Sequence, residues 1–468
     1  MSPEAITRRD FLRYAGAGLA AMAVPGVLSS AFAADRKPNI ILIVADDLGY
    51  GELGCQGCKD IPTPNIDSIA ANGARFTNGY VSCPVCSPTR AGLMTGRYQQ
   101  RFGHELNPGP PGLAQDNFGL PLSETLLPAR LKTAGYVTGM SGKWHLGYKK
   151  GYLPLDRGFD EFFGFPGGAH AYSNPQTESE NPVMKGDKPY DEKEYLTDAF
   201  GREAAAFVEK HKARPFFLYL PFNAVHGPLE ATEKYESRFS GIKDGKRRTF
   251  AAMLSAMDDN VGKVLDAVRR NGLENDTVIF FISDNGGPTK STTSANSPLK
   301  GFKGDTYEGG IRVPYMVQWK GKIPAGKTYD QPVISLDIAP TACAIAGAKT
   351  DGAKFDGANL MPFLTGRTSA VPHEALYWRY GSRYAIREGN WKLVDNGTGK
   401  FELYDLSRDV GESKDLAADK PNKVKKLTAR LKQWESELVK PLWQMQREKK
   451  EKPGKTAGEK TSRQQKNK

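Results

Sequence analysis

The chain has 468 residues, a length that suggests two or three domains or one large domain with an appendage. Hydrophobic residues make up 39% and charged residues 25%, as in ordinary globular proteins, and five cysteines are too few for a disulfide scaffold. The formal net charge is +12, and residues 447–468 hold nine Lys or Arg against three Glu. The rest of the chain has no basic stripe. We therefore expect no nucleic-acid partner and a basic, disordered tail over 447–468.

Residues 1–34 have the features of an export signal. The pair Arg8-Arg9 precedes an apolar stretch over 15–27 and an A-x-A cleavage pattern at 31–33. The pair resembles the twin-arginine signal of bacteria, although an ordinary secretory peptide with two arginines is the alternative. We therefore expect a periplasmic or secreted protein that uses the twin-arginine export machinery. No later apolar run reaches the roughly 18 residues that a spanning helix needs, so we expect no membrane span in the mature form.

Three continuous apolar runs predict buried strands of the kind found in parallel sheets. They lie at Asn39–Ala45, Phe216–Phe222 and Thr277–Ser283. Amphipathic helices are predicted at Asn65–Asn72, Ser123–Ala134, Asp198–Lys210 and Thr249–Arg270, and a short apolar helix that contains Cys343 at Ala339–Ala346. Strands that alternate with helices predict an α/β domain over residues 35–370, with a large, mainly parallel sheet sandwiched by helices.

The pattern changes after residue 370, where short aromatic segments are separated by Gly or Asn turns. The segments lie at Leu376–Tyr380, Tyr384–Arg387, Trp391–Val394 and Phe401–Leu403, and a helix is predicted over Asn422–Leu438. Residues 371–446 therefore predict a smaller C-terminal domain of antiparallel sheet plus helix.

Acidic side chains follow two of the predicted buried strands. Asp46-Asp47 comes directly after the first strand, and Asp284-Asn285 comes directly after the third. Ligands of open α/β sheets bind beyond the carboxyl ends of the strands, and four oxygen ligands there favour Ca²⁺ or Mg²⁺ over zinc. Each pair alone is also typical of helix caps and turns. The two pairs together favour a metal site.

Cys86 precedes a predicted helix that begins with Ser-Pro and contains Arg90 one turn on. At a helix N-terminus the free N–H groups and the dipole are expected to lower the pKa of the thiol and to attract anions. The site therefore suits a tetrahedral oxyanion. A cysteine phosphatase loop needs five residues between Cys and Arg, whereas only three lie here, so that chemistry fits poorly.

The pattern Cys86-x-Pro-x-Arg90, continued through residue 97, resembles the signature of the type I sulfatases of the alkaline phosphatase superfamily. A second motif of that family is matched by Gly135–His145, and the Asp-Asp and Asp-Asn-Gly runs, Lys303 and the Glu-Gly-Gly at 308–310 complete the pattern. The matches follow the family's order over most of the predicted large domain, and the C-terminal sheet and helix also resemble the family.

The resemblance implies that a formylglycine-generating enzyme oxidises Cys86 to formylglycine, and that one divalent cation, Ca²⁺ or Mg²⁺, binds beside it. The implied metal ligands are Asp46, Asp47, Asp284, Asn285 and the modified Cys86. One hydroxyl of the hydrated aldehyde attacks sulfur, and the second loses its proton so that the sulfate hemiester collapses. A cysteine or serine has no second hydroxyl and could not complete this cycle.

The resemblance also assigns roles to basic residues. Lys143, Lys303 and the metal stabilise the charge on the sulfate oxygens, and Arg90 holds the hydrated aldehyde and a metal ligand. His145 is the partner of the second hydroxyl, and His226 lies near the leaving oxygen. Either His226 or Lys303 is the general acid. Export and a moderately basic body favour a sulfated carbohydrate, small or oligomeric, as substrate.

Several features leave alternatives open. Many arylsulfatases carry a Ser-His pair where this chain has the stretch 165–170, so whether His170 reaches the site stays open. Candidates for lining the substrate pocket, or for ordinary packing, are Arg101, His104, Trp144 and Tyr148. Cys55-x2-Cys58 and Cys83-x2-Cys86 have the spacing of a four-cysteine zinc site, and a Cys55–Cys58 disulfide is also possible. A phosphate- or phosphonate-ester hydrolase of the same superfamily, or a non-catalytic anion- or carbohydrate-binding protein on a sulfatase scaffold, is the alternative function.

Overall fold

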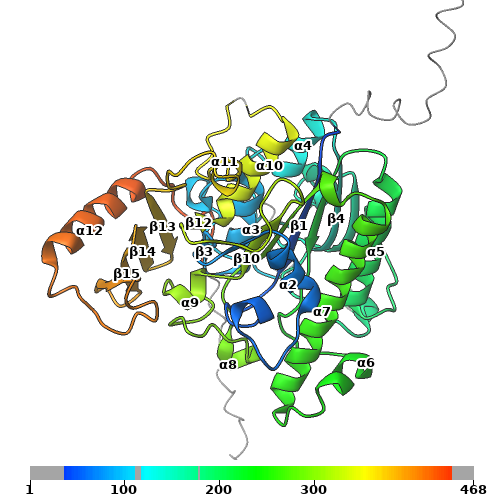
Figure 1. Ribbon diagram of the computed structural model, residues 1–468, viewed down its shortest axis with the longest axis horizontal. Coiled ribbons are helices and arrows are strands. Elements are labelled where there is room, and N and C mark those ends of the chain that lie inside the picture. The colour runs from blue at the N-terminus through cyan, green and yellow to red at the C-terminus, as the bar shows by residue number, and fades with distance from the viewer. Residues whose placement is uncertain (1–35, 111–117, 178–179, 351, 445–468) are drawn as a thin grey trace, which may run out of the picture.

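A ten-stranded mixed sheet runs through the centre of the protein (Figure 1), in the order β11-β2-β10-β9-β1-β8-β4-β5-β6-β7. The computed structural model describes residues 36–110, 118–177, 180–350 and 352–444. The predicted export signal over 1–34 and the predicted tail over 447–468 lie outside these residues. The strands are β1 (Asn39–Ala45), β2 (Ala74–Phe76), β4 (Val137–Lys143), β5 (Glu161–Phe165), β6 (Met184–Lys185), β7 (Lys188–Pro189), β8 (Phe216–Pro221), β9 (Thr277–Ser283), β10 (Tyr315–Gln318) and β11 (Lys327–Tyr329).

The five central strands, β9, β1, β8, β4 and β5, run parallel, and their carboxyl ends therefore meet at one edge of the sheet. Antiparallel pairs lie outside them, where β10 joins β9 and β2, and β6 joins β5 and β7. The prediction of a large, mainly parallel sheet is confirmed.

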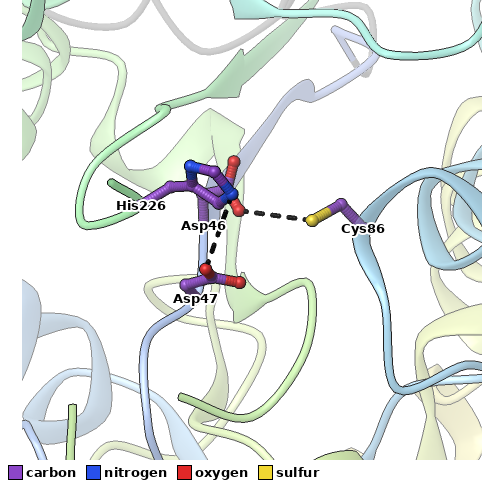
Figure 2. Close-up of side chains that lie close together, drawn as sticks. All are labelled: Asp46, Asp47, Cys86 and His226. Atoms are coloured by element: carbon purple, nitrogen blue, oxygen red, sulfur yellow. Dashed lines mark hydrogen bonds and ion pairs between the residues drawn. The ribbon is translucent and has the colours of Figure 1, made fainter. Parts of the chain in front are cut away.

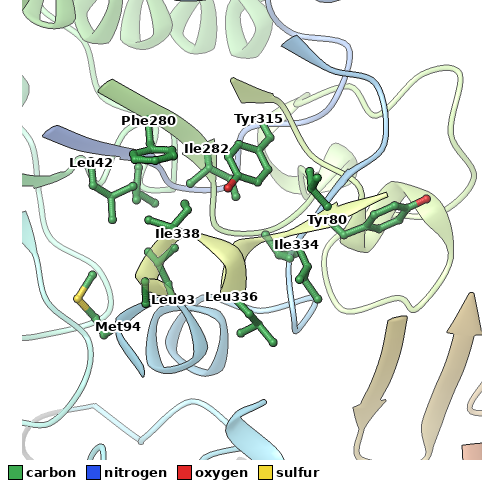
Figure 3. Close-up of a cluster of buried hydrophobic side chains, with 14 of the residues drawn as sticks. Leu42, Tyr80, Leu93, Met94, Phe280, Ile282, Tyr315, Ile334, Leu336 and Ile338 are labelled. Carbon is green, nitrogen blue, oxygen red and sulfur yellow. The ribbon is translucent and has the colours of Figure 1, made fainter. Parts of the chain in front are cut away.

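Helices cover both faces of the sheet, as predicted. They are α2 (Pro64–Ala71), α3 (Cys86–Thr95), α4 (Leu127–Thr133), α5 (Leu196–His211), α6 (Glu233–Glu236), α7 (Gly245–Arg270), α8 (Thr289–Thr292), α9 (Glu308–Ile311), α10 (Ile338–Ala346) and α11 (Met361–Leu364). Successive residues of a strand point to opposite faces. Ile41 and Ile43 of β1 accordingly pack in the cluster of α5 and α7, whereas Leu42 packs in that of α3 and α10. Figure 3 shows Leu42 and Ile338 among the side chains of this second layer.

The structure also contains elements that the sequence pattern does not predict. β4 carries two glycines and a serine and so lacks a continuous apolar run, yet it pairs with β8 and β5. A Cβ at Gly139 would lie 2.3 Å from the ring of Phe207 on α5, so glycine lets that helix approach the strand. The helix predicted from Ser123 begins at Leu127, because Pro128 has no N–H to donate and fits only the first turn.

The C-terminal part is a four-stranded antiparallel sheet with one helix, as predicted. The elements are β13 (Ala375–Tyr380), β14 (Arg383–Glu388), β15 (Trp391–Asn396), β16 (Glu402–Asp405) and α12 (Pro421–Glu435), and they lie beside the main sheet in Figure 1. Trp434 of α12 stacks on Tyr377 at 5.2 Å between ring centroids. The buried Trp378 donates from Nε1 to the carbonyl of Val81 at 2.7 Å, next to the short pair β3 (Gly79–Tyr80) and β12 (Val333–Ile334). Apolar packing is therefore continuous between the two parts.

Within the described ranges, no helix combines the length and the apolar character needed to cross a membrane. Cys343 is buried in α10, as expected for a core residue.

Candidate active site

The polar residues singled out by the sequence meet at the carboxyl edge of the parallel strands. Lys143 is the last residue of β4, the two acidic pairs directly follow β1 and β9, and Cys86 begins α3. Arg90 lies one turn into α3, and His226 and Lys303 lie in loops. In Figure 2 Asp46 faces Cys86, at the start of α3, and His226 faces Asp47, which lies below it in this view. The residues brought together are Asp46, Asp47, Cys86, Arg90, Lys143, His226, Asp284, Asn285 and Lys303.

Asp46 is fully buried and contacts residues of two other elements, α3 and β4. Its Oδ1 lies 3.6 Å from Cys86 Sγ, and its Oδ2 lies 2.5 Å from Lys143 Nζ and 3.4 Å from the guanidinium of Arg90. Burial alone would raise the pKa of this carboxyl, but the charges of Lys143, His226 and Arg90 outweigh that effect and hold the pKa below its ordinary value. Asp46 is therefore a carboxylate at neutral pH.

Asp47 faces the opposite side of the cluster. Its Oδ1 accepts from Lys303 Nζ at 2.6 Å and from Asn285 Nδ2 at 2.7 Å, and its Oδ2 lies 3.7 Å from His226 Nε2. Burial opposes ionisation here too, yet Lys303 and His226 keep the pKa of Asp47 lowered. Its backbone has a φ of 61°, a conformation that non-glycine residues rarely adopt and that is enriched at functional sites. Ser294 Oγ donates to its carbonyl at 2.9 Å and stabilises that conformation.

Arg90 is completely buried and connects three segments. Its Nε and a terminal nitrogen donate to Asp284 Oδ2 at 3.0 and 2.8 Å, and its other terminal nitrogen donates to the carbonyl of Lys143 at 3.0 Å. Because the planar guanidinium fixes these directions, Arg90 orients both the end of β4 and the carboxylate of Asp284.

Cys86 is the first residue of α3 and is buried. The expectation of a lowered thiol pKa at this helix N-terminus is wrong. Burial raises the pKa of Cys86 to about 12, since desolvation and the charges of Asp46 and Asp284 outweigh Lys143 and Lys303. The unmodified thiol stays protonated at neutral pH and is a poor nucleophile.

His145 lies just beyond β4 and is 5% exposed, with a φ of 61°. Within the described chain its Nδ1 has no hydrogen-bond partner. Burial and the neighbouring Lys143 and Arg90 hold its pKa well below the ordinary value, so the imidazole is neutral at neutral pH. A Cβ at Gly168 would lie 2.5 Å from His145 Nε2. Gly168 was not predicted as a site residue, although a Gly-Gly pair one residue after the end of β5 is a signal for such a close approach.

The four candidate lining residues separate in the structure. His104 is buried against α3, where its Nε2 lies 2.6 Å from Ser87 Oγ. Ser87, which was not predicted as a site residue, also donates from Oγ to the carbonyl of His145 at 2.6 Å. Trp144 is fully buried, and Arg101 bonds to Asp356 and Glu437. Tyr148 lines a cavity of about 500 Å³, together with Phe162, Pro166 and Met184. His170 is buried with its ring 4.9 Å from that of Phe165.

The donor set fits a hard divalent cation. Asp46, Asp47, Cys86 and His226 each offer a ligand atom within 4.8 Å of the others, and the buried Asn285 Oδ1 has no hydrogen-bond partner in the described chain. Carboxylate and amide oxygens are the donors that Ca²⁺ and Mg²⁺ prefer. His226, which was not predicted as a ligand, thus lies among these atoms, and Asp284 directs Oδ2 at Arg90.

The four-cysteine zinc site is not formed by the described residues, since the metal-capable group contains Cys86 alone among the cysteines. Cys55 and Cys58 are free thiols, and Cys58 Sγ bonds to Asp60 Oδ1 at 3.2 Å.

Comparisons with known proteins agree with this geometry. A family model described as Sulfatase matches residues 38–348, and one described as N-sulphoglucosamine sulphohydrolase, C-terminal, matches residues 303–440. Arylsulfatase A of Homo sapiens is 34% identical over 451 residues, which cover 83% of this chain and 85% of that protein. N-acetylgalactosamine-6-sulfatase of Mus musculus is 34% identical over 383 residues, covering 77% and 72%. The crystal structure of Ps i-CgsB in complex with k-i-k-neocarrahexaose shares 38% identity and superimposes with a TM-score of 0.83, over 87% of this chain and 95% of that chain.

Proposed function

The chain belongs to the sulfatase family and is a sulfuric ester hydrolase, and we propose that it removes sulfate from a sulfated carbohydrate, with formylglycine made from Cys86 as its nucleophile. The observation that carries this proposal is the place of Cys86. Its Sγ lies 3.6 Å from Asp46 Oδ1, at the N-terminus of a ten-residue helix, inside a cluster that also holds Lys143 and Lys303.

The protonated state of the Cys86 thiol is consistent with a mechanism in which this residue acts as formylglycine and not as cysteine. With a pKa of about 12, Cys86 offers almost no thiolate at neutral pH, so the unmodified chain has no ready nucleophile at this point. As a hydrated aldehyde, the residue supplies one hydroxyl that attacks sulfur and a second whose deprotonation releases the sulfate. A formylglycine-generating enzyme is therefore a proposed partner of this chain.

Lys143 and Lys303 are the residues that would bind the sulfate oxygens. Lys143 is completely buried, and Lys303 is 18% exposed and so remains accessible to solvent. Burial would lower the pKa of Lys303, but Asp47 and neighbouring negative groups raise it well above its ordinary value, so the ammonium persists at neutral pH. Fixed positive charges in a largely dry site stabilise the charge that develops as the S–O bond breaks.

Two histidines supply proton transfer in this proposal. His145, neutral and buried, is the proposed partner of the second hydroxyl. The side chain of His226 is 25% exposed, and its Nδ1 lies 2.6 Å from the carbonyl of Gly227, which fixes the orientation of the ring. Either His226 or Lys303 protonates the leaving oxygen.

The residues that would hold one Ca²⁺ or Mg²⁺ are Asp46, Asp47, Asp284, Asn285 and residue 86, with His226 at their side. When bound, the cation supplies positive charge to the hydrated aldehyde and to a sulfate oxygen. In its absence Arg90, Lys143 and Lys303 are the counter-charges of the carboxylates.

A sulfated carbohydrate is the proposed substrate class because the structure of Ps i-CgsB contains neocarrahexaose. Export through the twin-arginine machinery to the periplasm or the medium is proposed from residues 1–34, and would place the enzyme where polysaccharides are degraded.

Mass spectrometry of protein from its native host tests the nucleophile. We expect the peptide that contains Cys86 to be lighter than the cysteine form by about 18 Da, the difference between a thiol and an aldehyde. The same protein should release sulfate from some member of a panel of defined sulfated oligosaccharides. An unmodified thiol in active protein contradicts the formylglycine mechanism. Faster hydrolysis of phosphate or phosphonate monoesters than of any sulfate ester contradicts the proposed substrate.

A further inference from the structure

Lys303 lies in a tight turn whose shape decides where its ammonium group points. The N–H of Asp305 donates to the carbonyl of Phe302 at 2.9 Å, and Gly304 has a φ of 93°. This is a β-turn with glycine at the third position, where a positive φ is required. Lys303 occupies the second position and directs Nζ to within 2.6 Å of Asp47 Oδ1.

Asp305 closes this turn with its side chain and is held by the C-terminal sheet. Its Oδ2 accepts from the N–H of Phe302 at 3.2 Å, and its Oδ1 accepts from Asn396 Nδ2 at 2.9 Å. Asn396, the last residue of β15, also accepts with its Oδ1 from the N–H of Thr306 at 2.9 Å. One amide side chain therefore fixes both the closing residue of the turn and the residue that follows it.

A second anchor lies just beyond the turn. Glu412, which is buried with a φ of 50°, accepts with Oε2 from the N–H of Glu308 at 2.7 Å. Lys392 Nζ lies 2.8 Å from Glu412 Oε1 and 2.9 Å from Glu308 Oε1. Because this contact holds the start of α9, the C-terminal part also fixes the segment that follows Asp305 in the chain.

On the other side, the turn bonds to the loops that carry the reacting groups. The N–H of Gly304 donates to the carbonyl of Pro84 at 2.9 Å, two residues before Cys86. The N–H of Lys303 approaches the carbonyl of Gly287 at 3.4 Å, just after Asn285. The turn is thus clamped between the catalytic edge of the main sheet and the C-terminal sheet.

We propose that Asn396 is a positioning residue for Lys303: the C-terminal sheet, through Asn396 and Asp305, sets the place of the ammonium group that receives the sulfate. This inference rests on the proposed function, in which Lys303 binds sulfate oxygens. Asn396 acts only through Asp305 and the turn.

The first test compares Asn396→Ala with a control asparagine in the turn just before the same strand, Asn390→Ala. Asn390 is exposed at the opposite end of β15. With an aryl sulfate as substrate, we expect Asn396→Ala to lower kcat by roughly 10- to 100-fold, as displacements of about 1 Å do, with a smaller change in KM and a near wild-type Tm. Asn390→Ala should keep the wild-type kcat. Wild-type kcat in Asn396→Ala contradicts the inference.

A double-mutant cycle separates positioning from general loss of structure. Asn396→Ala should weaken binding of inorganic sulfate in the wild-type background and have no further effect when Lys303→Ala is present. Sulfate binding is the readout because it needs no turnover. An equal loss in both backgrounds shows that Asn396 does not act through Lys303 and overturns the inference.

A polarity swap supplies a rescue. Asn396→Asp places a carboxylate against Asp305 Oδ1 and should lower kcat further than Asn396→Ala. Adding Asp305→Asn restores one donor and one acceptor across the same contact, with the direction reversed, and should recover most of the kcat. No recovery in the folded double variant counts against the inference. A wild type that neither binds inorganic sulfate nor hydrolyses any sulfate ester contradicts the proposed function itself, a result distinct from any variant ratio.

Discussion

Two buried clusters of charged side chains lie in this protein, and they differ in how completely their members are satisfied. The catalytic cluster, named for its proposed role, comprises Asp46, Asp47, Arg90, Lys143 and Lys303. The C-terminal cluster comprises Glu308, Arg312, Lys392 and Glu412. In the C-terminal cluster the side chains of Lys392, Glu308 and Glu412 are 0% exposed. In the catalytic cluster Lys303 is 18% exposed and the neighbouring His226 is 25% exposed.

Hydrogen-bonding capacity separates the clusters further. Glu308 bonds through Oε1 to Lys392 at 2.9 Å and through Oε2 to Tyr80 at 2.6 Å and Arg312 at 3.2 Å. Next to the catalytic cluster, Asn285 Oδ1 and His145 Nδ1 are buried without partners in the described chain. In the C-terminal cluster Glu412 Oε1 makes no hydrogen bond either, but the ammonium of Lys392 lies 2.8 Å from it and balances its charge. Similar residue types therefore serve two purposes. The C-terminal cluster, which is sealed from solvent and paired within itself, joins two parts of the fold. The catalytic cluster, which is partly exposed and has unpartnered polar atoms beside it, can receive a ligand.

Removing the proposed nucleophile is expected to have the largest effect. Cys86→Ala should lower kcat by on the order of 10⁴-fold or more, because no hydroxyl remains to attack sulfur. Cys83→Ala is the matched control, since Cys83 is also buried and lies three residues earlier. It should lower Tm slightly and keep kcat. Steady-state kinetics and thermal unfolding check both variants, and substantial turnover by Cys86→Ala would mean that another group is the nucleophile.

Lysine-to-methionine changes in the two clusters should have opposite signatures. Lys392→Met leaves two buried carboxylates without their shared cation, so we expect a loss of about 3–5 kcal/mol in the free energy of unfolding. Lys303→Met should cost far less stability and lower kcat by roughly 10²- to 10³-fold. Urea unfolding and kinetics on both proteins check this contrast. Equal losses of stability in the two variants would remove the distinction between the clusters.

Removing the divalent cation should affect the catalytic cluster alone. A chelator is expected to abolish sulfate release and to lower the free energy of unfolding by about 2.7 kcal/mol relative to protein with the cation at 100 times its Kd. Thermal unfolding with EDTA, and after Ca²⁺ or Mg²⁺ is restored, measures this loss. Asp47→Asn should reduce the stabilisation by added cation, whereas the decrease in Tm caused by Lys392→Met should be the same with and without it.

The smallest effect concerns pH and the C-terminal cluster. Burial, with the charge of Glu308, raises the pKa of Glu412 to about 7 from an ordinary value near 4.5. The folded protein thus holds this proton more tightly than the unfolded chain. Its contribution to stability is present below pH 4.5 and is lost as pH rises through about 7. Glu412→Gln should therefore flatten the decline of Tm between pH 5 and 8. An unchanged decline in the variant would assign the pH dependence to another group.

Local patterns in the amino-acid sequence predict much of the fold and the identity of the site residues. The apolar runs that form β1, β8 and β9 are buried on both faces, and such runs can be recognised as strands without knowing which strands pair with them. The motif residues Asp46, Cys86 and Lys303 can also be recognised as site candidates from the sequence, because the motifs that contain them match those of one family. Predictions failed where the determinant lay elsewhere in the chain. The strand β4, with its two glycines, forms because β5 and β8 pair with it and Phe207 packs on Gly139.

Properties that depend on burial and on distant partners required the folded chain. A cysteine at a helix N-terminus suggests an acidic thiol, but desolvation in this cleft reverses the direction of the pKa shift for Cys86. The contact between Asn396 and Asp305 joins residues 91 positions apart, and no periodicity in either segment signals it. Short-range order arises from neighbouring residues, whereas charge state and the positions of catalytic groups arise from the dielectric surroundings and contacts that tertiary packing brings together.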